Sequence, residues 1–79
     1  MTLTTSRGQT LEADFALPAH NRLHIRLADE RPLHEIAAEI DMLESLTADG
    51  QELTGPFLLT ALILDERTGR VTATLRKEG

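Results

Sequence analysis

The sequence predicts an α+β fold in which one amphipathic helix packs on a mainly antiparallel sheet, in the order β-β-β-α-(β)-β-β. Three observations favour this fold. Apolar and polar residues alternate early in the chain, the apolar spacing becomes helical in the middle, and two strand-like segments flank a turn near the end. No linker, repeat or low-complexity segment divides the 79 residues, so we expect a single domain over 1–79.

A hairpin is predicted at the start of the chain, because Gly8 in the segment 6–9 can take the positive φ of a tight turn. The next strand is half-buried and ends at Pro18, which lacks the amide donor that a sheet needs. Its apolar positions are Leu11, Ala13, Phe15 and Leu17. A further strand is predicted at 22–27, where Leu23, Ile25 and Leu27 alternate with Arg22, His24 and Arg26.

A helix is predicted at 31–46, where the apolar residues follow a period of 3.6. The apolar stripe consists of Leu33, Ile36, Ala37, Ile40, Leu43 and Leu46. Pro32 suits the first turn of a helix, since the missing N–H has no partner there, and Gly50 provides a stop. The polar face carries His34, Glu35, Glu39, Asp41 and Ser45.

The last third of the chain predicts a hairpin. A short edge strand is expected at 51–54 and is interrupted by Gly55 and Pro56. The segment 57–64 is apolar on both faces, 65–70 has the composition of a turn, and 71–76 alternates again.

The segment 57–64 is the most informative part of the sequence, because one helix can cover only one face of a sheet. Three interpretations remain open. The segment is a central strand partly covered by loops, a strand covered by another subunit, or a misread helix. Under the second interpretation the candidate interface residues are Phe57, Leu59, Ala61 and Ile63.

Composition argues against several functions. The chain has no cysteine, which excludes disulfides and thiolate metal sites. Its net charge of −5 has the wrong sign for a phosphate-binding surface, and its only aromatic residues are two phenylalanines. We therefore expect no nucleic-acid partner. No secretion signal or membrane-spanning stretch is recognisable, so the expected location is the cytoplasm.

Two groups of side chains are candidates for chemistry. His20 and His24 are spaced for a metal only on a helix, whereas a strand is predicted there. Glu35 and Glu39 lie one helical turn apart on the polar face, and a pair of carboxylates is the minimum for glycoside-type acid–base chemistry. We expect both groups to be solvent-exposed polar residues, and we assign no catalytic, cofactor or metal site and no small-molecule substrate.

Three segments form a recognisable pattern: Gly8-Gln9-Thr10-Leu11-Glu12-Ala13-Asp14, the segment 53–57 with Gly55 at its centre, and the alternating segment 71–77 with its final basic pair. In these segments the sequence resembles small uncharacterised prophage-encoded proteins from tail and structural gene cassettes. Pro56 stands where these proteins usually have an aromatic residue. The resemblance implies a structural or assembly accessory without catalytic residues, able to form oligomers and associated with the virion if it is phage-derived.

The expected function is thus that of a non-enzymatic assembly or protein-interaction protein that self-associates or binds a protein partner. Two alternatives remain. One is a small nucleic-acid-binding regulator, which would need a basic face built from Arg22, Arg26, Arg67, Arg70 and Arg76. The other is a metal-dependent enzyme that uses His20, His24 or the acidic helix face.

Overall fold

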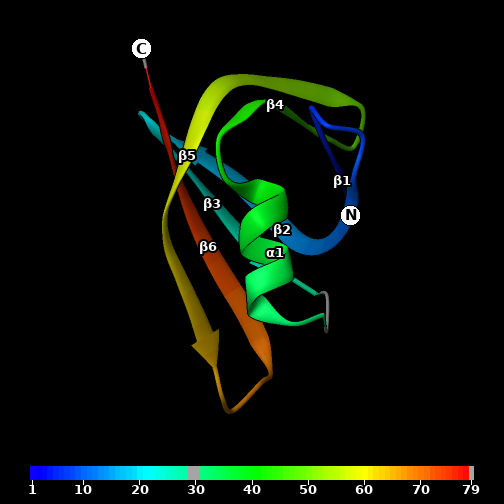
Figure 1. Cartoon of the computed structure of the whole chain (residues 1–79), viewed down its shortest axis with the longest axis vertical. Coiled ribbons are helices and arrows are strands. Elements are labelled where there is room, and N and C mark those ends of the chain that lie inside the picture. The colour runs from blue at the N-terminus through cyan, green and yellow to red at the C-terminus, as the bar shows by residue number, and fades with distance from the viewer. Residues whose placement is uncertain (29–30, 79) are drawn as a thin grey trace.

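The protein is a closed barrel of antiparallel strands with one short helix, as seen in a computed structural model that describes residues 1–28 and 31–78 (Figure 1). The strands are Thr2–Thr5 (β1), Thr10–Ala19 (β2), Arg22–Leu27 (β3), Leu43–Ala48 (β4), Gln51–Asp65 (β5) and Arg70–Lys77 (β6), and the helix is Leu33–Ile40 (α1). Neighbouring strands around the barrel follow the order β1-β2-β3-β6-β5-β4, and β4 pairs with β1 to close it.

The α+β prediction is therefore wrong. We expected one helix to cover the apolar face of an open sheet. In the barrel, opposite walls of the sheet cover each other, and α1 adds only Ile36 and Ile40 to the buried interior. The buried apolar residues are Leu3, Leu11, Ala13, Leu23, Ile25, Leu27, Ile36, Ile40, Leu43, Leu46, Phe57, Val71, Ala73 and Leu75.

The opening hairpin and the strand at 22–27 are confirmed. The single apolar face expected for the second strand is not, because the pairing of β2 with β3 shifts register between Ala13 and Phe15. Beyond that point Leu17 pairs with His24 and is 56% exposed. The strand also continues past Pro18, where β2 has only β3 beside it, and proline is tolerated at such an edge.

The predicted helix at 31–46 ends at Ile40. Asp41 is extended, with φ −87° and ψ 142°, and Met42 has a φ of +54°, so the chain turns sharply and enters β4. Leu43 and Leu46, which completed the helical stripe, are buried strand residues. A register shift between Leu43 and Ser45 lets both leucines face the interior at a spacing of three, which an unbroken strand does not allow.

The side chain of Arg7, in the turn between β1 and β2, holds the end of α1. Its guanidinium donates hydrogen bonds to the carbonyl oxygens of Ala38 and Glu39, both at 2.8 Å, and of Asp41 at 3.1 Å. The last carbonyl groups of a helix lack amide partners and form the negative end of its dipole. Arg7 therefore stabilises α1 and fastens it to the opening hairpin.

Replacement of Arg7 by alanine is expected to lower the free energy of unfolding by about 1–2 kcal/mol, because three carbonyl groups lose a charged donor. Urea unfolding followed by circular dichroism measures the change. The control is Arg67→Ala in the β5–β6 turn, which is expected to change stability by less than about 0.5 kcal/mol. Equal effects of the two substitutions would contradict the role of Arg7.

The closing hairpin differs from the prediction in its first strand. The expected short strand at 51–54 and the apolar strand at 57–64 are one continuous strand, β5, which passes through Gly55 and Pro56. At the tip, the Gly69 amide donates to the Asp65 carbonyl oxygen at 2.8 Å, and the Asp65 carboxylate accepts from the Arg67 amide at 3.0 Å. The turn predicted at 65–70 is confirmed.

Candidate functional site

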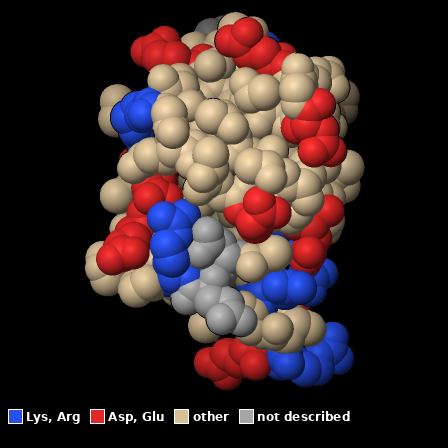
Figure 2. Space-filling model, turned by 90° about the vertical axis from the view of Figure 1, so that its right-hand side faces the viewer, with Lys and Arg blue, Asp and Glu red and all other residues tan. Residues whose placement is uncertain are grey.

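The second half of β5 forms an edge of the sheet. β4 pairs only with Gln51–Phe57, so the segment Leu58–Asp65 has a single strand neighbour, β6, within the described residues. This part of the β5–β6 hairpin extends past the rest of the molecule at the bottom of Figure 1. Figure 2 shows charged side chains of both signs at the same lower end.

The edge segment is apolar and carries no charge from Leu58 to Leu64. Ile63 is 62% exposed and Leu64 is 45% exposed. The Leu59 amide donates to the Asp41 carboxylate at 3.1 Å, so the end of α1 occupies the edge at that residue. Natural sheets protect free edges with charged residues or proline, and neither occurs between Leu58 and Leu64.

The four predicted interface residues do not share one face. Phe57 is 5% exposed and belongs to the core, and Leu59 packs against the core beside Leu75. A register shift between Leu59 and Ala61 then changes the direction of the strand's side chains. Ala61 pairs with Thr74 and Ile63 with Thr72, on the outer face of the barrel.

Leu64 is the exposed residue that the sequence prediction missed. It pairs with Val71, which faces the interior, but it lies so far along the hairpin that the barrel no longer covers it. The unbroken apolar segment next to the turn was the available signal. Ile63 and Leu64 thus present apolar side chains on both faces of the free edge.

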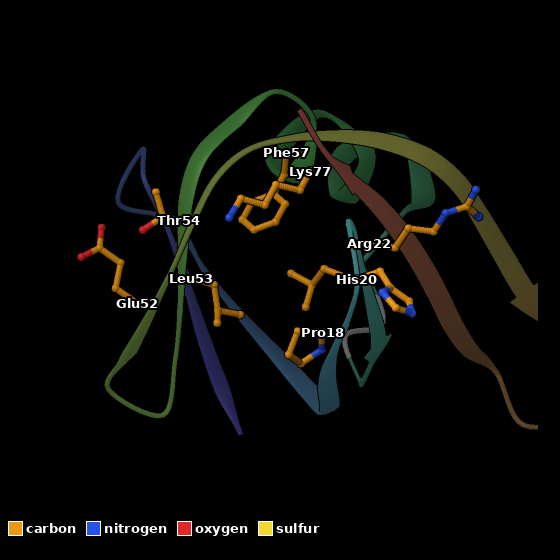
Figure 3. Close-up of a pocket in the computed structure, with 9 residues that line it drawn as sticks. Pro18, His20, Arg22, Glu52, Leu53, Thr54, Phe57 and Lys77 are labelled. Carbon is orange, nitrogen blue, oxygen red and sulfur yellow. The ribbon is translucent and has the colours of Figure 1, made fainter. Parts of the chain in front are cut away.

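A cavity of about 280 Å³ opens at the mouth of the barrel, at the end of β6 opposite the β5–β6 turn (Figure 3). The β2–β3 turn forms one side of it, and the first half of β5 forms the other. His20 in this turn has a φ of +54°, a conformation uncommon for residues other than glycine. The lining residues are Pro18, His20, Arg22, Leu23, Glu52, Leu53, Thr54, Phe57 and Lys77.

The walls of this cavity are apolar and its charges lie at the rim. Pro18 and Leu53 point into it from opposite sides, and the Lys77 side chain runs across it beside the Phe57 ring (Figure 3). The carboxylate of Glu52 points outward (Figure 3). Among residues 1–28 and 31–78, no carboxylate lies within ion-pair distance of the Lys77 ammonium.

The three histidines lie apart. His20 is at the barrel mouth, His24 is on β3 with its Nδ1 3.4 Å from the Thr74 hydroxyl, and His34 is exposed on α1. No group of three or more histidine, aspartate or glutamate side chains suited to a metal ion occurs within the described part of the chain.

The predicted acidic face is also dispersed, because the helix ends early. Glu39 pairs with Arg31 at 2.7 Å, and Asp41 binds the Leu59 amide. Glu35 remains exposed in the first turn of α1.

Three of the arginines considered for a basic face are paired with carboxylates. Arg26 and Arg70 both contact Asp14, at 3.9 Å and 3.2 Å, and Arg76 contacts Glu78 at 2.6 Å. Their positive charge is therefore partly neutralised on the outer surface of the sheet.

Comparison of the chain with models of protein families, with curated proteins and with solved structures finds no match. In the described residues, no helix has the length and apolar character needed to cross a membrane.

Proposed function

We propose that the protein is a non-enzymatic assembly protein that self-associates through the free edge of β5. The observation that carries this proposal is the segment Leu58–Leu64, which is uncharged, has only β6 as a strand neighbour in the described residues and exposes Ile63 and Leu64. Beyond Leu59, whose amide binds Asp41, such an edge offers backbone donors and acceptors next to apolar side chains, and another strand can satisfy both.

A second copy of the chain suits this edge as its partner. Two identical edges pair antiparallel about a two-fold axis, which is the commonest symmetry of soluble dimers. With Ile63 at the axis, Ala61 of one copy lies opposite Asp65 of the other, so no like charges face each other in the paired segment. The two β5–β6 hairpins then form one four-stranded sheet.

The net charge of the protein determines how self-association depends on salt. Each copy carries −5, so two copies repel each other, and salt screens that repulsion. An interface made by backbone hydrogen bonds and apolar side chains keeps its strength in salt. Dimer formation should therefore increase, or stay constant, as ionic strength rises.

Substitution of Ile63 by lysine is expected to abolish the dimer, because it places two like charges at the two-fold axis and removes apolar contact. Sedimentation velocity at micromolar concentration measures the result. The wild-type protein is expected to sediment as a dimer, and the Ile63→Lys protein as a monomer of 8.7 kDa.

The matched control is Leu17→Lys. Leu17 is 56% exposed, close to the 62% of Ile63, but it lies on β2, away from the free edge of β5. The dimer should therefore persist in this variant. The proposed self-association would be overturned if the wild-type protein remained an 8.7 kDa monomer at 100 µM. It would also be overturned if Leu17→Lys weakened the dimer as much as Ile63→Lys.

A role in a phage particle is the more specific part of this proposal. It is supported by the resemblance of the segments 8–14 and 71–77 to prophage-encoded proteins. Capsid or tail genes on both sides of the coding sequence would favour this origin, and unrelated metabolic genes would count against it.

A further inference from the structure

We infer that the mouth of the barrel binds a small carboxylate carried on an apolar body. The cavity lies at the opposite end of β6 from the β5–β6 turn, so the inference is independent of self-association. Three features carry it: apolar walls, an ammonium group that has no carboxylate partner among residues 1–28 and 31–78, and a size that fits a small ligand.

The apolar walls come from β2, β3 and β5. Pro18 and Leu53 point into the opening from opposite sides (Figure 3), and Leu23 and Phe57 also line the cavity. These side chains offer no hydrogen-bonding group to water, so water in the cavity is readily displaced by an apolar group. Ligand sites in β-barrels are commonly found at the mouth, with apolar walls and a few polar groups that fix the ligand's orientation.

The charge at the mouth favours an anion. Lys77 and Arg22 provide two cations there against the single carboxylate of Glu52, although the whole chain carries −5. Lys77 is the only lysine in the sequence, and its ammonium has no carboxylate partner in the described residues. A ligand carboxylate next to Lys77 would gain a charge-assisted hydrogen bond while its apolar part contacts Leu53 and Phe57.

The size of the cavity limits the ligand. A volume of about 280 Å³ corresponds to roughly nine water molecules, which admits a ligand of about ten non-hydrogen atoms. Ligands of this size in an open site bind weakly, with dissociation constants of about 0.1 to several mM. A branched carboxylate such as 4-methylpentanoate fits both the volume and the chemistry.

The experiment is a titration of the protein with 4-methylpentanoate, followed by the backbone amide signals in NMR spectra. Saturable shifts are expected at Leu23, Leu53, Phe57 and Lys77. Reductive ¹³C-methylation of the single lysine adds a direct probe of the ammonium group. The neutral isostere 4-methylpentanamide should bind at least about five-fold more weakly, since it lacks the charge that Lys77 recognises.

Variants separate the role of Lys77 from general apolar binding. Lys77→Gln should reduce the affinity for the carboxylate to that for the amide, whereas Lys77→Arg should retain it. Arg67→Gln is the control, because Arg67 lies in the turn at the other end of the molecule. Lys77 is exposed, so its replacement is not expected to affect folding, and the melting temperature of each variant checks this.

Two sources can provide such a carboxylate: a free acid or the carboxyl terminus of a peptide. N-acetylvaline and N-acetylvalinamide, which are small enough for the cavity, test the second source. Saturable binding of either carboxylate, with loss in Lys77→Gln, supports the inference, and their relative affinities identify the source. Absence of saturable shifts with both carboxylates, or equal binding of the acids and their amides, would overturn it.

Discussion

Replacement of Ile40 by alanine is expected to lower the free energy of unfolding by about 2–5 kcal/mol. Ile40 is the last residue of α1 and is completely buried. Its truncation removes apolar contact and leaves a cavity, and the hydrogen-bonded strands around it cannot collapse freely to fill the space. For 79 residues the total stability is roughly 4–12 kcal/mol, so a large part of it would be lost.

Chemical unfolding with urea, followed by circular dichroism, measures this change. Met42→Ala is the matched control, because Met42 follows two residues later but is 71% exposed. Its truncation should alter stability by less than about 0.5 kcal/mol. An Ile40→Ala protein with wild-type stability would show that α1 does not contribute to the core.

Substitution of Gly55 by alanine is expected to destabilise the protein by about 1–3 kcal/mol or more, because there is no space for a side chain. A Cβ atom at this position would lie 2.7 Å from the Phe57 nitrogen and 2.8 Å from the carbonyl oxygens of Leu43 and Glu44. All three are backbone atoms, so β4 and β5 would have to move apart where Leu43 pairs with Phe57.

Thermal unfolding tests this expectation, and NMR spectra locate the disturbance at Leu43, Glu44 and Phe57. The control is Gly8→Ala. Gly8 has a φ of +83° with no atom near its would-be Cβ, so alanine there costs only about 1 kcal/mol of backbone strain. An unchanged melting temperature for Gly55→Ala would contradict the close approach of β4 and β5.

The strands that rest on regular alternation were predictable from the sequence. The strand at 22–27 is an example, since Leu23, Ile25 and Leu27 all face the interior. The end of the helix was not predictable in this way. Leu43 and Leu46 keep a helical spacing of three, but a register shift in β4 produces the same spacing in a strand.

Closure of the sheet leaves no local pattern in the sequence. It depends on β1 pairing with β4, and an apolar alternation in each strand is equally consistent with an open sheet. The expected fold class was wrong for this reason. With closure, the opposite wall of the barrel covers apolar residues for which we had expected a helix or a second subunit.

The candidate sites were predicted only in part. The apolar segment 57–64 pointed to Ile63, but periodicity alone could not reveal the register shift that separates Phe57 and Leu59 from Ala61. The barrel mouth was not predicted at all. Its residues come from the end of β2, the β2–β3 turn, β3, β5 and the end of β6, and a single lysine near the end of the sequence forms no recognisable motif.

The pairing of β1 with β4 also bears on how the chain reaches its native state. Thr4 pairs with Thr47 and Arg22 of β3 pairs with Arg76 of β6, whereas the β1–β2, β2–β3, β4–β5 and β5–β6 pairs join neighbours in sequence. The loop-closure entropy of the β1–β4 contact is therefore larger, and high contact order slows folding. The hairpins of consecutive strands can form early, while the β1–β4 and β3–β6 pairs form only after distant parts of the chain meet. Until β1 pairs with β4, the interior apolar residues of both strands stay open to water and to other chains.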